Sequence, residues 1–269
     1  MAVDPARNGP GPAPGYRDKP RHVVRHEPTP KRLRATFAGQ AVFDTTRALI
    51  LFETNHVPVY YVPRADVAME LLTPTDHVTY CPFKGEAGYW TIAAGGRTAE
   101  NAVWGYTSPY DEAADLAGYV AFYWNRLDHW YEEDEEAFVH ARSPYVRIDI
   151  LPSSRPVRVV LGGVEVAQST RAHFLFETGL PVRYYLPRED VRMDLLTPTD
   201  TATRCPYKGQ AAYYSAGVGG TVHQDIVWTY REPVAESARI RDLLCFYNEK
   251  VDAIYVDGVE QPKPVTKWS

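Results

Sequence analysis

The sequence contains little cysteine and no long hydrophobic segment. Three of its 269 residues are cysteine, and an odd, sparse count fits a reducing compartment better than a disulfide framework. The cysteines lack the paired CxxC spacing of a structural zinc site, so we expect no metal. No apolar run approaches the roughly 18 residues that a membrane span needs, and the first residues lack the apolar stretch of a secretory signal. We therefore expect a cytoplasmic protein without a membrane partner.

Phosphate-binding and nucleic-acid signatures are also missing. The net charge is −5, whereas broad binding to nucleic acid needs clustered positive charge. The sequence has no GxGxxG opening a helix and no GxxxxGK[ST] loop. The glycine pairs at 95–96 and 219–220 precede no paired acidic residues of the kind that hold Mg²⁺ in nucleotidyl transfer. We therefore expect neither a nucleic-acid partner nor a bound cofactor.

The chain consists of two copies of one sequence. RALILFET (47–54) aligns with RAHFLFET (171–178), and MELLTPTD (69–76) with MDLLTPTD (193–200), both at a separation of 124 positions. The register continues without a gap to FYWNRLD and FYNEKVD, and nearly half of the aligned positions are identical. A repeat of this length is too large for a solenoid unit. Each copy is therefore predicted to be a complete domain with its own core.

The composition divides the chain into five segments. We predict a disordered Pro/Gly-rich tail over residues 1–30, a first domain over 31–134, a linker over 135–154, a second domain over 155–260 and a C-terminal tail over 261–269. The oligomeric state stays open. A monomer with two repeats related by a pseudo-twofold axis is one arrangement that this organisation allows.

Each domain is predicted to be mainly β. Residues 157–169 alternate apolar side chains around Gly162–Gly163, as in a hairpin. Period-2 alternation predicts further strands at FLFET, RYYLP, DVRMDLL, AAYYSAG and DIVWTY, whereas TPTD suggests a turn. One segment per copy has helical periodicity, over residues 240–251 and 116–127. We thus predict two tandem two-sheet β domains, each with one packed C-terminal helix.

The segments CPFKG (81–85) and CPYKG (205–209) are the first candidate site. Their proline and glycine are typical of a turn with the cysteine packed beneath it. Alternatively, a thiol three residues before a lysine can act as a nucleophile or ligand contact. No histidine is shared between the copies, so the repeat supplies no common Cys/His dyad. The catalytic candidates are Cys81, Lys84 and Glu53 in the first copy and Cys205, Lys208 and Glu177 in the second.

Arginine and aromatic residues form the second candidate set. Arg47 and Arg171 lie six residues before Glu53 and Glu177, so on a strand each pair would share a face and form either a cavity or a structural salt bridge. The aromatic residues suit core packing or, with the charges, a flat polar-edged ligand. The ligand-binding candidates are Arg47, Tyr61, Tyr89 and Trp104 in the first copy, and Arg171, Arg183, Tyr185, Tyr213 and Trp228 in the second. Val59 replaces Arg183 in the first copy, which favours the second copy as the better site.

The segments LFETGLPVRYYLP, DVRMDLLTPTDTATRCPYKGQAAYY and DIVWTYREP resemble the family of domains of unknown function 427, here present twice. The resemblance covers Arg155 to Gly258 closely and Leu33 to Asp134 nearly as well. It implies a compact, mainly β fold similar to the β-tent group and carries a nucleotidyltransferase-like label. The family motif marks the residues Arg171, Glu177, Tyr185, Cys205, Lys208 and Trp228, with their first-copy counterparts.

Two functions follow as hypotheses. The first is binding of a small polar or aromatic metabolite, nucleotides included, in a pocket of each repeat. The second is an enzyme, thiol-dependent or nucleotidyltransferase-like, that acts through the CP[FY]KG segment. The sequence leaves open whether any reaction is catalysed.

Overall fold

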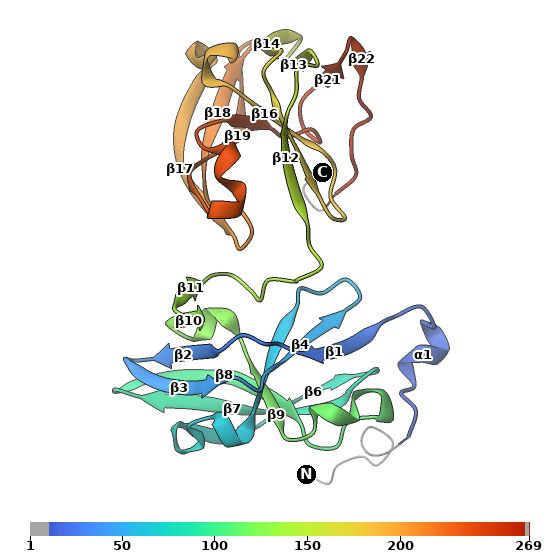
Figure 1. Cartoon of the computed structure of the whole chain (residues 1–269), viewed down its shortest axis with the longest axis vertical. Helices are drawn as coiled ribbons and strands as arrows, with labels where there is room; N and C mark the ends of the chain where they lie inside the picture. The colour runs from blue at the N-terminus through green and yellow to red at the C-terminus, as the bar shows by residue number, and fades with distance from the viewer. Residues whose placement is uncertain (1–10, 267–268) are drawn as a thin grey trace. The chain divides into compact units, whose positions relative to one another are not determined.

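The structure is a computed structural model that describes residues 11–266 and Ser269. The chain divides into two compact units, Met1–Ala141 and Arg142–Ser269, here called unit 1 and unit 2 (Figure 1). Both units are built from antiparallel sheets with a few short helices. The predicted fold class, two tandem and mainly β two-sheet domains, is confirmed.

Unit 1 combines two sheets. The first has seven strands in the order β1-β4-β5-β9-β8-β7-β6, and the second has four in the order β11-β10-β2-β3. The strands are β1 (Val24–Pro28), β2 (Leu33–Phe37), β3 (Gln40–Thr45), β4 (Leu49–Glu53), β5 (Val59–Pro63), β6 (Leu72–Cys81), β7 (Gly85–Ala94), β8 (Arg97–Tyr106), β9 (Tyr119–Phe122), β10 (His129–Glu132) and β11 (Glu135–Ala137). The helices are α1 (Gly15–Asp18) and the 3₁₀ helices η1 (Arg64–Asp66), η2 (Met69–Leu71), η3 (Asp111–Leu116) and η4 (Trp124–Arg126).

Unit 2 repeats this arrangement. Its sheets have the orders β12-β15-β16-β20-β19-β18-β17 and β14-β13-β21-β22. The strands are β12 (Ile148–Pro152), β13 (Val157–Leu161), β14 (Val164–Ser169), β15 (His173–Glu177), β16 (Arg183–Leu186), β17 (Leu196–Cys205), β18 (Gly209–Val218), β19 (Thr221–Pro233), β20 (Leu244–Phe246), β21 (Ala253–Val256) and β22 (Val259–Glu260). The 3₁₀ helices are η5 (Arg188–Asp190), η6 (Met193–Leu195) and η7 (Ala235–Ile240).

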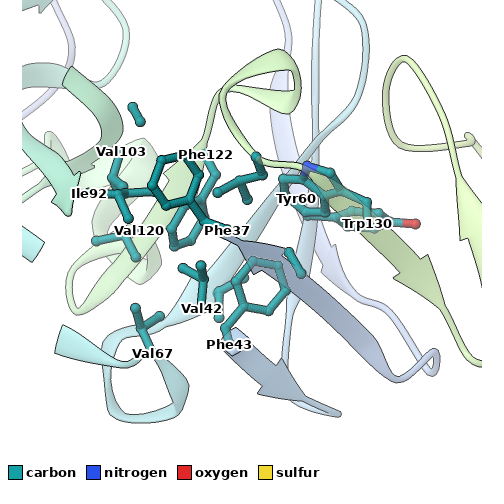
Figure 2. Packing of buried hydrophobic residues seen from close by; sticks show 14 of the residues in the cluster. Phe37, Val42, Phe43, Tyr60, Val67, Ile92, Val103, Val120, Phe122 and Trp130 are labelled. Atoms are coloured by element: carbon teal, nitrogen blue, oxygen red, sulfur yellow. The ribbon is translucent and has the colours of Figure 1, made fainter. Parts of the chain in front are cut away.

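The main core of each unit lies between its two sheets. In unit 1, Phe37 and Phe43 of the small sheet pack with Ile92, Val103 and other residues of the large sheet (Figure 2). Trp130 closes one end of this core, with its ring 5.3 Å from that of Phe43. Unit 2 forms the equivalent core from β13, β14 and β21 against its seven-stranded sheet.

The opposite face of the seven-stranded sheet is buried as well. Ile50 and Tyr60 point into the main core of unit 1, whereas their neighbours Leu51 and Tyr61 point to the other face, because successive strand residues alternate. There they pack with Leu116 of η3. The central strands are thus covered on both sides, which explains their nearly continuous apolar sequence.

The predicted packed C-terminal helix, over residues 116–127 and 240–251, is wrong in both units, since these segments contain strands β9 and β20. The helical element that packs on the sheet is the short η3 or η7, and Leu244–Phe246, within the predicted helical segment, is strand β20. All three residues of β20 are buried, so the strand lacks the alternation that distinguishes a strand from a helix.

Two other local predictions are wrong. Val191, Met193 and Leu195 do not form a strand, because η5 and η6 flank an isolated bridge at Val191. The TPTD segment is not a simple turn but part of the ten-residue strand β17, which pairs irregularly with β18 between Pro198 and Ala202.

Parts of the expected tail and linker belong to the units. Within the predicted tail, residues 15–18 form α1 and residues 24–28 form β1, which pairs with β4. Residues 1–10 lie outside the described residues. The expected linker supplies β11 to unit 1 and β12 to unit 2. Among the described residues, no helix has the length and hydropathy required to cross a bilayer.

Candidate functional site

The CP[FY]KG segment is a tight turn between two strands in each unit. Cys81 ends β6 and pairs with Gly85 at the start of β7, and Lys84 N donates to Cys81 O at 3.3 Å. Unit 2 has the same bond between Lys208 N and Cys205 O, also at 3.3 Å. Gly209 has φ +102°, and a Cβ at this position would lie 2.9 Å from Glu232 O. The turn therefore requires glycine at this position.

The lysine of this turn reaches a glutamate on a distant strand. Lys84 Nζ forms an ion pair with Glu53 Oε2 at the end of β4, and both side chains are buried, at 7% and 9% exposure. The turn adjoins β7, four places from β4 in the sheet order. A flat sheet would separate these strands by about 19 Å, far beyond the reach of the two side chains. The sheet therefore curls, and the ion pair joins its two sides.

In unit 1 the glutamate has a second partner. His22 Nε2 donates to Glu53 Oε1 at 3.1 Å, and the His22 ring stacks on Phe83 at 3.7 Å between centroids. Burial opposes ionisation of Glu53, but the hydrogen bonds from Lys84 and His22 lower the pKa of Glu53 below its ordinary value. The carboxylate is therefore ionised and bound from two sides.

Unit 2 keeps the ion pair and lacks the histidine. Lys208 Nζ lies 2.5 Å from Glu177 Oε2, and both side chains are largely buried. Val146 occupies the position that corresponds to His22. Ser143 N instead donates to the hydroxyl of Tyr207, the counterpart of Phe83, at 2.7 Å. The segment before each domain thus covers the turn, by different contacts in the two units.

The three cysteines are free and differ in burial. Cys81 and Cys205 are half-buried beside their turns, whereas Cys245 is fully buried on β20. Cys81 packs against the buried cluster that contains Tyr61 and Tyr106. Burial raises the pKa of Cys245 to about 12, so this thiol stays protonated. Among the described residues, no group of three or more His, Cys, Asp or Glu side chains forms a metal site.

A strip of three aromatic residues lies on the same face as the turn. We call Tyr89, Trp104 and Tyr123 the aromatic strip of unit 1, and Tyr213, Trp228 and Tyr247 that of unit 2. The tryptophan and the last tyrosine have ring centroids 4.6 Å apart in both units. Tyr89 and Tyr213 bind a threonine hydroxyl of the edge strand, at 2.8 and 2.7 Å.

A hydrogen bond behind each strip fixes the tryptophan. Trp104 Nε1 donates to Tyr61 Oη at 3.3 Å, and Trp228 Nε1 donates to Tyr185 Oη at 3.0 Å. Both tyrosines are almost fully buried. Burial raises the pKa of Tyr61 well above its ordinary value, and that of Tyr185 likewise. These hydroxyls are therefore neutral positioning groups.

Unit 2 has a buried arginine beside its strip. The Arg183 guanidinium donates two hydrogen bonds to Glu249, at 2.6 and 2.7 Å, and lies 5.5 Å from the centroid of Trp228. Thr266 of the C-terminal segment also donates to Glu249, at 2.7 Å. In unit 1 the corresponding residues are Val59 and Asn125. This is the main chemical difference between the two strips.

The arginines Arg47 and Arg171 do not join the glutamates. Strand β4 begins only at Leu49, so the alternation from Glu53 does not extend to Arg47. The Arg47 side chain is 63% exposed and pairs with Asp66, and Arg171 pairs with Asp190 at 2.8 Å. The interpretation of a shared Arg and Glu face is wrong, and these arginines are held in structural salt bridges.

A comparison with protein families decides the assignment. The model of the domain of unknown function 427 matches residues 25–133 and 149–257, which correspond to the two units. The chain belongs to the DUF427 family, as a tandem pair. No curated protein matches the chain. Both matches begin before the domain starts that we predicted, residues 31 and 155. They include most of β1 and β12, which pair with β4 and β15.

Each DUF427 unit gathers most of the candidate residues. In unit 1, the second face of the large sheet carries Tyr61, Tyr89 and Trp104 beside Cys81, and the Lys84–Glu53 pair closes the same face. Sequence reasoning missed four contributors: His22, Glu249, Tyr123 and Tyr247. Tyr123 and Tyr247 are identical residues at equivalent positions of the two copies, and this identity could have marked them as site residues. His22 and Glu249 are present in one copy alone and gave none.

Proposed function

We propose that this DUF427 protein binds a small polar or aromatic metabolite with a planar group, nucleotides included, along the aromatic strip of each unit. The observation that carries the proposal is the repeated geometry of Trp104–Tyr123 and Trp228–Tyr247, at 4.6 Å in both. Tyr123 is 43% exposed although it packs on the half-buried Trp104. An exposed ring on a fixed aromatic support is suited to stacking with a planar ligand.

The enzyme alternative has weaker support. A thiol-dependent mechanism uses the lysine ammonium to stabilise the thiolate, but Lys84 and Lys208 direct this group to Glu53 and Glu177. A nucleotidyltransferase-like mechanism would require paired acidic residues that hold Mg²⁺, and neither glycine pair, 95–96 or 219–220, precedes such residues. We therefore assign the ion pair to holding the curled sheet and the strip to binding. A cytoplasmic location is also part of the proposal and agrees with three free thiols.

Calorimetric and thermal-shift titrations test the proposal. The probes are AMP, GMP, UMP, riboflavin and free tryptophan, with wild-type protein and the double variant Tyr123→Ala/Tyr247→Ala. We expect at least one probe to raise the melting temperature and the double variant to bind it about 5- to 150-fold more weakly. The control is Tyr131→Ala/Tyr255→Ala, which removes a repeat-related tyrosine pair from the smaller sheets. An equal loss in the control, or no response to any probe, would contradict the proposal.

A further inference from the structure

The two aromatic strips differ in what covers the tryptophan. In unit 2 the Arg183 guanidinium lies 5.5 Å from the Trp228 ring centroid, and Trp228 is only 7% exposed. In unit 1 the residue at this position is Val59, and Trp104 is half-buried. The neighbouring tyrosine follows the same trend, since Tyr123 is exposed and Tyr247 is half-buried. The strip of unit 1 is therefore the more open one, contrary to the sequence-based preference for the second copy.

Arg183 shows which chemical group fits this position. Its guanidinium is planar, and planar cations stack favourably on indole rings. Glu249 accepts two of its N–H groups in a bidentate pair, the geometry that a guanidinium fork matches. Asn125 replaces Glu249 in unit 1 and is exposed. Its side-chain oxygen can accept N–H donors from a group placed over Trp104, without a formal charge.

We propose that the strip of unit 1 binds a planar guanidinium or amidinium group of a small molecule over Trp104, at the place that Arg183 occupies in unit 2. The inference rests on the proposed function and specifies the ligand class of one of its two sites. In unit 2 the Arg183 side chain already occupies this position, so unit 2 does not bind the same group there.

The surrounding charges favour a delocalised cation over a compact one. Arg126 acts electrostatically on Tyr123, and Asn125 offers no negative charge. A guanidinium spreads its charge and is more weakly hydrated than an ammonium. The nearby carboxylate of Glu53, at the end of β4, is engaged with Lys84 and His22. Planar stacking and two-pronged N–H donation, which the compact ammonium cannot combine, therefore dominate recognition.

Agmatine and 1,4-diaminobutane are a matched pair of probes, because they differ only at one end, where agmatine has a guanidinium and the diamine an ammonium. We expect agmatine to shift the indole N–H signal of Trp104 in ¹H–¹⁵N spectra and to bind at least about tenfold tighter than the diamine. The signal is assigned with Trp104→Phe. Equal shifts from both probes, or no shift from agmatine, would overturn the inference.

Reciprocal exchange of the two residue pairs provides the control. Val59→Arg/Asn125→Glu fills the subsite of unit 1 and is expected to abolish the agmatine shift at Trp104. Arg183→Val/Glu249→Asn empties unit 2 and is expected to create an agmatine shift at Trp228. An unchanged Trp104 response in the first variant, with the Trp130 signal intact as a fold check, contradicts the inference. If AMP or riboflavin still binds in that case, the proposed function stands and only the ligand class fails.

Discussion

Lys208 Nζ lies 2.5 Å from Glu177 Oε2, although the turn that carries the lysine and the strand that carries the glutamate are four places apart in their sheet. The contact is possible because the sheet curls. Unit 1 has the same pair in Lys84 and Glu53. Because the ion pair is present in both units, we infer that it stabilises the fold and does not serve a reaction of one unit alone.

Removal of one partner of this pair should destabilise unit 2. Lys208→Met leaves the Glu177 carboxylate buried without its cation, and breaking a buried pair in this way costs about 3–5 kcal/mol. Urea unfolding followed by circular dichroism measures the change in free energy. Lys208→Met/Glu177→Leu removes both charges and should recover most of the loss. A single variant as stable as wild type would show that the pair does not hold the sheet.

The Arg183–Glu249 pair predicts sensitivity to acid. Burial opposes ionisation of Glu249, but hydrogen bonds from Arg183 and Thr266 lower its pKa to about 2. Because this is below the ordinary value of about 4.3, the pair contributes stability above that pH and loses it as the pH falls toward 2. Glu249→Gln should therefore show a smaller decrease in unfolding free energy between pH 5 and 2. Equal pH profiles for wild type and variant would contradict the assignment.

The cysteines should differ in reactivity. Cys245 is fully buried, with its pKa raised to about 12, and the thiolate is the reactive form. Cys81 and Cys205 are half-buried. Iodoacetamide at pH 8 should modify Cys81 and Cys205 first and Cys245 only after denaturation. Peptide mass spectrometry over time separates the three sites, and early modification of Cys245 would contradict the packing of β20.

The turn glycine should tolerate no side chain. Gly209→Ala places a Cβ 2.9 Å from Glu232 O at φ +102°, so a loss of about 1–3 kcal/mol is expected. Gly217, near the other end of the same strand β18, has no positive φ and no neighbouring atom within 4 Å of a built Cβ. Gly217→Ala is the control and should be neutral or slightly stabilising. Thermal unfolding compares the two, and equal effects would contradict the steric argument.

The sequence alone predicts the duplication, the hairpins and most strands, because repeat identity and alternation are local signals. It does not predict strand β20, since a strand buried on both faces has no alternation. The site was only partly predictable. Glu53 and Lys84 are 31 residues apart, and their contact depends on the curl of a seven-stranded sheet, which local spacing does not reveal. Arg47 illustrates the opposite error. We predicted that Arg47 shares a face with Glu53, but β4 begins only at Leu49, so the alternation of strand residues does not extend to Arg47.

The central claim is that the repeated aromatic strip, and not the lysine turn, is where ligands bind. The most direct measurement follows the indole N–H signals of the ¹⁵N-labelled protein while AMP, GMP, UMP, riboflavin and agmatine are added in turn. We expect at least one probe to shift the signal of Trp104 or Trp228. The signals of Trp124 and Trp130, whose rings stack at 4.2 Å in the main core, should not move. Shifts confined to Trp124 and Trp130, or a spectrum unchanged by every probe, would contradict this claim.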